Sequence, residues 1–177
     1  MTAMGELASA AAGVFVLLVV LRAALHKAMD FVELQGFVAD YRLLPQAWVV
    51  PVSALLVAVE FILAACVALP LTRTAGLMGC ALLFAGYGVA IGINIARGHS
   101  RIECGCGGAP QMLSVSLLVR NTVLIMLALF AAGVVPGPLA VGDRAVAIAT
   151  GVFALALYLL FEQLNANRVF LKKRGPL

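Results

Sequence analysis

The stretch RGHSRIECGCGGAPQM, residues 97–112, decides the fold because it is a long polar connection between two strongly apolar runs. Thr74 to Ala96 before it contains no charged residue, and Leu113 to Val135 after it contains only Arg120. Each run is long enough to cross a hydrocarbon core of about 30 Å, which takes roughly 20 helical residues. We therefore expect two membrane-spanning helices joined by this loop.

The composition of the whole chain agrees with a membrane protein. Of the 177 residues, 64% are hydrophobic and 11% are charged, whereas about a quarter of a soluble protein is charged. Such a chain cannot cover itself with polar surface, so lipid must surround most of it. The net charge of +4 does not indicate nucleic-acid binding, because the basic residues lie at the ends of apolar runs and form no patch with aromatic residues.

Three further runs are long enough to span a membrane: Leu7 to Leu25, Ala47 to Leu71 and Ala145 to Leu164. The first is interrupted by Arg22, and the only charge in the second is Glu60. The last is the weakest, since its uncharged core ends at Phe161. We predict an all-α membrane bundle that forms one domain over residues 1–177, with a four-helix core, a fifth span and a basic tail over residues 165–177.

The segment between the first two spans, residues 26–46, has a different pattern. Its apolar residues recur at three- and four-residue spacing: Phe31, Leu34, Phe37, Val38 and Tyr41. This spacing predicts a short amphipathic helix at the membrane surface, which Pro45 ends.

The basic residues predict an orientation, because five spans put the two termini on opposite sides. The side of the N-terminus has Arg73 and Arg144. The other side has eight: Lys27, Arg42, Arg97, Arg101, Arg168, Lys172, Lys173 and Arg174. Because basic residues are enriched in cytoplasmic loops, this charge count predicts that the C-terminus, the amphipathic segment and the 97–112 loop face the cytoplasm.

Cys104 and Cys106 are the candidate reactive residues, and glycines surround them. Glycine permits the tight backbone that a bridge between cysteines two apart would need, and such a strained bridge is readily reduced. Arg101 lies in the same loop, and nearby cations favour the reactive thiolate. Two alternatives remain: incidental loop thiols, or a metal site with His99, although zinc would need a fourth ligand that the loop does not offer. We expect no metal.

Cys66 and Cys80 form a candidate second thiol pair, since each lies five or six residues inside adjacent antiparallel spans. Free cysteine is also an ordinary small buried residue, and we favour that interpretation. At ~1.5 Å per helical residue, about 20 Å or more separates the two pairs. Any relay between them would need a quinone, a partner protein or a large movement.

Glu60 lies near the middle of its span, where an ionised carboxylate is costly unless it is paired. Arg120 is about two turns into the fourth span, and it could reach toward Glu60 or extend back to the interface. Asn121 could extend this polar group. His26, next to Lys27 at the end of the first span, is interpreted as an interface anchor in preference to a proton relay.

Taken together, these residues resemble the MauE family, which is grouped with DoxX-like redox-associated membrane proteins. The resemblance covers roughly residues 8–135. The matching features are His26-Lys27 with Asp30, Tyr41-x-x-Leu44-Pro45, Glu60, Cys104-Gly105-Cys106-Gly107 and Arg120-Asn121. Relatives often have an aromatic residue where this chain has Gly107-Gly108, so the resemblance carries over the cysteines but not a role for an aromatic side chain.

The resemblance implies a bacterial inner-membrane protein of methylamine utilisation. It would help a periplasmic methylamine dehydrogenase to mature, in particular its disulfide-rich small subunit, together with a thioredoxin-like periplasmic partner. The expected activity is thiol-disulfide exchange at Cys104 and Cys106. The alternative is a non-catalytic scaffold or chaperone that docks the partner and the immature subunit. A protein that serves periplasmic disulfides is expected to present its cysteines to the periplasm, which conflicts with the charge count.

Overall fold

The computed structural model describes residues 3–99, 102, 104–105, 112–134, 137 and 140–173. This part of the chain is helical and contains no β-strand, as the all-α prediction requires. The long helices are α1 (Ala3–Met29), α3 (Val49–Ala68), α4 (Arg73–Ala96), α5 (Val115–Gly133) and α6 (Val141–Lys173). Two short ones, α2 (Phe31–Asp40) and the 3-10 helix η1 (Gln46–Trp48), precede α3. All five long helices are long and apolar enough to cross a membrane, which confirms the predicted fold class.

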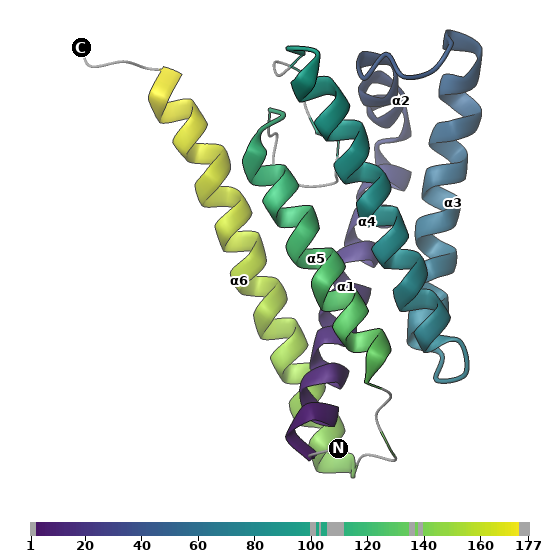
Figure 1. Ribbon diagram of the computed structural model, residues 1–177, viewed down its shortest axis with the longest axis vertical. Helices are drawn as coiled ribbons and strands as arrows, with labels where there is room; N and C mark the ends of the chain where they lie inside the picture. The colour runs from purple at the N-terminus through teal and green to yellow at the C-terminus, as the bar shows by residue number, and fades with distance from the viewer. Residues whose placement is uncertain are drawn as a thin grey trace.

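The core of the bundle is formed by α1, α3, α4 and α5. Its fully buried side chains include Val16, Leu77 and Ala128, which come from three different helices. Helix α6 packs along α1 on the outside of this group (Figure 1). Helices α3 and α4 approach closely, because a Cβ added at Gly76 would lie 2.7 Å from the backbone nitrogen of Val67.

Two helix ends next to the loop have left-handed caps. Helix α4 ends at Ala96, and Gly98 just after it has φ +76°. The amides of Gly98 and His99 donate to the carbonyls of Ile95 and Asn94. This is the Schellman arrangement, which satisfies carbonyls that a helix end leaves without partners. Arg42 has φ +49° just after α2. These turns direct the chain back over the same end of the bundle.

The structure groups several segments at the end of the bundle opposite the N-terminus. Figure 1 shows α2, the last turns of α4, the first turns of α5 and the C-terminal end of α6 at that end. We call this end the loop face. The α3–α4 turn lies toward the other end, which also holds the N-terminus.

Helices α1 and α6 are longer than the sequence pattern predicted. Helix α1 continues past Leu25 to Met29, and α6 begins at Val141 and continues beyond Phe161 to Lys173. At ~1.5 Å per residue, α6 is about 50 Å long, more than the hydrocarbon core requires. Lys27 and Glu162, which follow the uncharged parts of these two spans, are helical and buried.

Candidate functional site

The described part of the loop holds Cys104 against the bundle. Cys104 is buried and disulfide-bonded, and the hydroxyl of Tyr41 donates to its backbone carbonyl at 3.1 Å. Burial raises the pKa of Tyr41 to about 12, against an opposing effect of the Arg120 guanidinium, so this hydroxyl remains a donor at neutral pH. Cys106 and Arg101 lie outside the described residues.

Gly105 allows the loop to pack tightly on α2. Its φ is +62°, in the left-handed region that favours glycine. A Cβ at this position would lie 2.7 Å from Cδ2 of Phe37. The glycine next to Cys104 is thus required both by its backbone conformation and by the closeness of the α2 ring.

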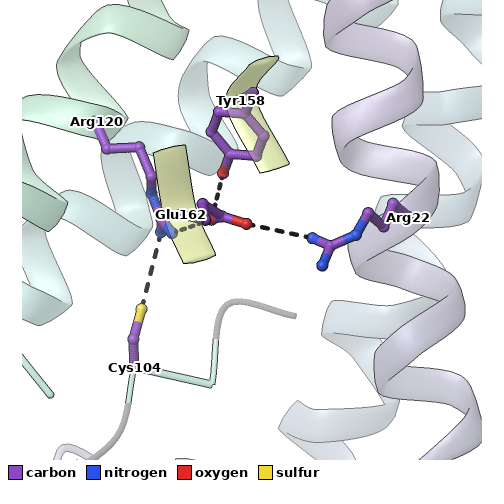
Figure 2. Close-up of polar contacts among 5 residues, drawn as sticks. All are labelled: Arg22, Cys104, Arg120, Tyr158 and Glu162. Carbon is purple, nitrogen blue, oxygen red and sulfur yellow. Dashed lines mark hydrogen bonds and ion pairs between the residues drawn. The ribbon is translucent and has the colours of Figure 1, made fainter. Parts of the chain in front are cut away.

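An ion-pair cluster centred on the buried Glu162 lies beside Cys104 (Figure 2). The Nη2 of Arg120 is 3.9 Å from the Cys104 sulfur, and the Nη1 is 2.9 Å from Oε1 of Glu162. Glu162 also accepts a hydrogen bond from the Tyr158 hydroxyl at 2.7 Å and pairs with Arg22 at 3.5 Å. We call these four residues the Glu162 cluster. The Arg120 guanidinium places a fixed positive charge next to the Cys104 sulfur. This charge favours the thiolate once the disulfide is reduced.

A second ion pair lies on α1 and α3. Lys27 donates to Glu60, and both side chains are almost fully buried. The Tyr87 hydroxyl donates to Oε1 of Glu60 at 2.7 Å and accepts from Lys27 at 3.0 Å. We call these three residues the Glu60 cluster. Burying two charges is tolerable only with this kind of mutual pairing and hydrogen bonding.

The partner of Arg120 therefore differs from the one considered in the sequence. Arg120 pairs with Glu162 of α6, and Glu60 pairs with Lys27 of α1. Glu60, Arg120 and Asn121 nevertheless line one small cavity of about 20 Å³. Each contributes a buried atom without a hydrogen-bond partner among the described residues: Glu60 Oε2, Arg120 Nε and Asn121 Nδ2. A cavity of this size holds about one water, which would link the two clusters.

Lys27, the residue after His26, lies inside the bundle. Its side chain is 4% exposed and points into the bundle, because Glu60 and Tyr87 provide partners there. His26, one residue earlier, is half-buried and belongs to neither cluster in the described structure. Asn121 lines the small cavity, and its role in extending the polar group stays a prediction.

The two other cysteines lie away from the loop. Cys66 and Cys80 are free thiols, and Cys80 is a fully buried member of the apolar core. Their role as a second thiol pair stays a prediction. Across the described residues, no three His, Cys, Asp or Glu side chains gather in a way that could hold a metal ion.

Three partners in these clusters did not emerge from the sequence: Tyr87, Tyr158 and Glu162. Glu162 directly follows the uncharged run that ends at Phe161, inside the predicted fifth span, and no partner was predicted for it. A signal was present, since Tyr158 and Glu162 are four residues apart and thus share one helix face. Tyr87 has no such signal, because its partners come from two other helices.

The fold and site define a class: a polytopic helical membrane protein with a buried disulfide-bonded cysteine at one end, packed over two buried ion-pair clusters. The chain matches the family model described as "Methylamine utilisation protein MauE" over residues 4–134. It therefore belongs to the MauE family.

Individual relatives extend this match beyond the family model. A protein of Paracoccus denitrificans named "Methylamine utilization protein MauE" is 34% identical over 156 residues, covering 82% of this chain and 81% of the relative. Proteins of the same name from Methylorubrum extorquens and Methylophilus methylotrophus are 34% and 32% identical, covering 83% and 88% of this chain and 80% and 82% of the relatives. No solved structure matches the chain.

Proposed function

We propose that this chain is a membrane thiol-disulfide redox protein of methylamine utilisation. It would assist disulfide formation in the small subunit of a periplasmic methylamine dehydrogenase, together with a thioredoxin-like partner. The observation that carries the proposal is Cys104, a buried, disulfide-bonded residue whose sulfur lies 3.9 Å from the Arg120 guanidinium. The names of the relatives supply the pathway, and the site supplies the chemistry.

The proposed reaction is a balanced exchange at Cys104 and Cys106. A thiolate of the partner attacks one sulfur of the disulfide, which forms a mixed disulfide and releases the other sulfur as a thiolate. The second thiol of the partner then displaces the remaining sulfur. The partner loses two electrons and two protons, and Cys104 and Cys106 become a dithiol. Arg120 stabilises the thiolate that Cys104 forms when it leaves.

The proposed location is the bacterial inner membrane, with the loop face toward the periplasm. The charge count predicts the opposite orientation, with the C-terminus and the loop in the cytoplasm. Lys27 is one of the eight cations counted there, and its pairing with Glu60 explains its position without any effect on orientation. The other seven cations favour a cytoplasmic loop face. In that orientation, Cys104 and Cys106 would pass reducing equivalents outward from a cytoplasmic thioredoxin.

The test compares two double variants in cells that depend on methylamine. Cys104→Ser with Cys106→Ser removes the proposed disulfide, and Cys66→Ser with Cys80→Ser is the matched control. We expect the first variant to reach the membrane in normal amounts but to leave the dehydrogenase small subunit without its disulfides. The control should support maturation as the wild type does.

The competing function is a scaffold that docks the same proteins without redox chemistry. Normal maturation by the Cys104→Ser, Cys106→Ser variant would overturn our proposal in favour of that scaffold. Disulfide mapping of the small subunit by mass spectrometry distinguishes the two, because a scaffold variant would deliver a fully bridged subunit.

A further inference from the structure

Beside Cys104 lies an apolar cavity of about 420 Å³. It lies between α2, α3 and α4 at the loop face and is partly open. Its walls are aliphatic and aromatic, and Leu34, Phe37, Leu56 and Leu83 are among them. A volume of this size lies within the range of pockets that bind a small organic molecule. The amphipathic face of α2 therefore covers a cavity in addition to any contact with the membrane surface.

Few polar groups line this cavity. Lys27 and Tyr87 of the Glu60 cluster contribute to its wall, as do Cys104 and Tyr41. Lys27 is a three-donor ammonium that uses two donors, toward Glu60 and Tyr87. Within the described structure its third N–H has no partner. A buried cation with a spare donor at an apolar wall is suited to the carbonyl oxygen of a largely apolar ligand.

The cavity also has residues on the lipid side of the bundle. Leu82 and Leu44 line it and are 74% and 40% exposed in the isolated chain. Leu82 lies in the span α4, so its exposed surface faces hydrocarbon. A ligand dissolved in the bilayer could enter past these leucines without crossing water.

We propose that this cavity binds a quinone, which reoxidises the dithiol of Cys104 and Cys106. This inference rests on the proposed function, because each exchange with a partner leaves the dithiol behind. The dithiol gives two electrons and two protons to the quinone; a sulfur–sulfur bond forms, and the quinone becomes a hydroquinone. Lys27 donates to one quinone carbonyl oxygen, and the apolar walls hold the ring and its tail. A lipid chain would fill the same walls but would leave the Lys27 donor unused.

Gly86 offers a way to fill the cavity without disturbing the protein. It lines the cavity, and a Cβ added there would meet no atom within 4 Å. Gly86→Phe should therefore occupy the space of the quinone ring. Gly142→Phe is the matched control, since Gly142 is also helical with open space around its Cβ, but it lies at the start of α6 away from the cavity.

The experiment uses the full chain in lipid nanodiscs with decylubiquinone as the probe. We expect the wild type and the Cys104→Ser, Cys106→Ser variant to bind the probe. The pre-reduced wild type should also reduce one equivalent of decylubiquinone, and the loss of quinone absorbance measures this reduction. Gly86→Phe should weaken binding and slow reduction by at least about tenfold, while its disulfide still exchanges with a small dithiol. Gly142→Phe should behave as the wild type.

The outcomes separate this inference from the proposed function. A protein that exchanges disulfides but neither binds nor reduces decylubiquinone would overturn the quinone site and leave the proposed function standing. Binding and reduction that Gly86→Phe leaves unchanged would overturn the assignment to this cavity. Failure of the wild-type disulfide to exchange with any dithiol would instead overturn the proposed function on which the inference rests.

Discussion

Replacing Arg120 by glutamine should lower the reactivity of Cys104. The Arg120 Nη2 lies 3.9 Å from the Cys104 sulfur. At that distance, a unit charge interacts with a thiolate by about 4 kcal/mol when the effective dielectric constant is about 20. Glu162 pairs with the same guanidinium at 2.9 Å and offsets part of this attraction. If about 1.4 kcal/mol of this attraction remains, losing it lowers the ratio of thiolate to thiol at Cys104 about tenfold.

The assay measures the rate at which a maleimide alkylates reduced Cys104 at neutral pH. The background is Cys66→Ser, Cys80→Ser and Cys106→Ser, so that Cys104 is the only thiol. We expect Arg120→Gln to alkylate at least about tenfold more slowly. Arg120→Lys keeps the charge and should recover much of the rate.

The control for this prediction is Arg97→Gln. Arg97 is an exposed cation at the end of α4, and salt screens such a charge strongly. Its loss should change the alkylation rate by less than about twofold. An unchanged rate in Arg120→Gln, or an equal loss in both variants, would refute the role of the 3.9 Å contact.

Three further predictions concern the packing around the site. Lys27→Met should destabilise the protein by about 3–5 kcal/mol, because it leaves the buried charge of Glu60 unpaired. Unfolding in mixed micelles should show that adding Glu60→Leu restores part of the lost stability. Simple additivity of the two losses would contradict the pairing. Because burial raises the pKa of Tyr41 from 10.0 to about 12, its contribution to stability is complete below pH 10 and lost as the pH rises toward 12; Tyr41→Phe should lack this part of the alkaline fall in melting temperature, and an identical fall would count against it. Gly105→Ala should lower the melting temperature more than Gly98→Ala, since both have positive φ but only the first would place a methyl group 2.7 Å from a ring atom of α2; equal losses would exclude the ring contact as the cause.

The spans could be predicted from the sequence because the requirement for length and apolarity is local. Thr74 to Ala96 and the observed α4, Arg73–Ala96, differ by one residue. The ends of α1 and α6 were harder to predict from the sequence, because charges normally mark the limit of a span. Here Lys27 and Glu162 find opposite charges on other helices, so the helices continue past them.

The site could be predicted only as a set of residue types. Cys104, Glu60 and Arg120 are conspicuous in the sequence as a loop thiol and rare intramembrane charges. Their pairing depends on which helix faces point at one another, and that is a property of the bundle. Arg120 is next to Asn121 in the sequence, yet its partner Glu162 lies 42 residues later. The cavity could not be predicted from the sequence either, since it forms only where α2 packs against α3 and α4.

The most direct test of the central claim is the redox state and the side of Cys104 and Cys106 in living cells. A membrane-impermeant maleimide is applied to cells with permeabilised outer membranes, with and without mild reductant, in a Cys66→Ser, Cys80→Ser background. Our account predicts that both cysteines label from the periplasm, and only after reduction. Labelling that requires a broken inner membrane would contradict disulfide formation in the periplasm and support the charge count. Thiols that never change state would contradict redox chemistry at this site.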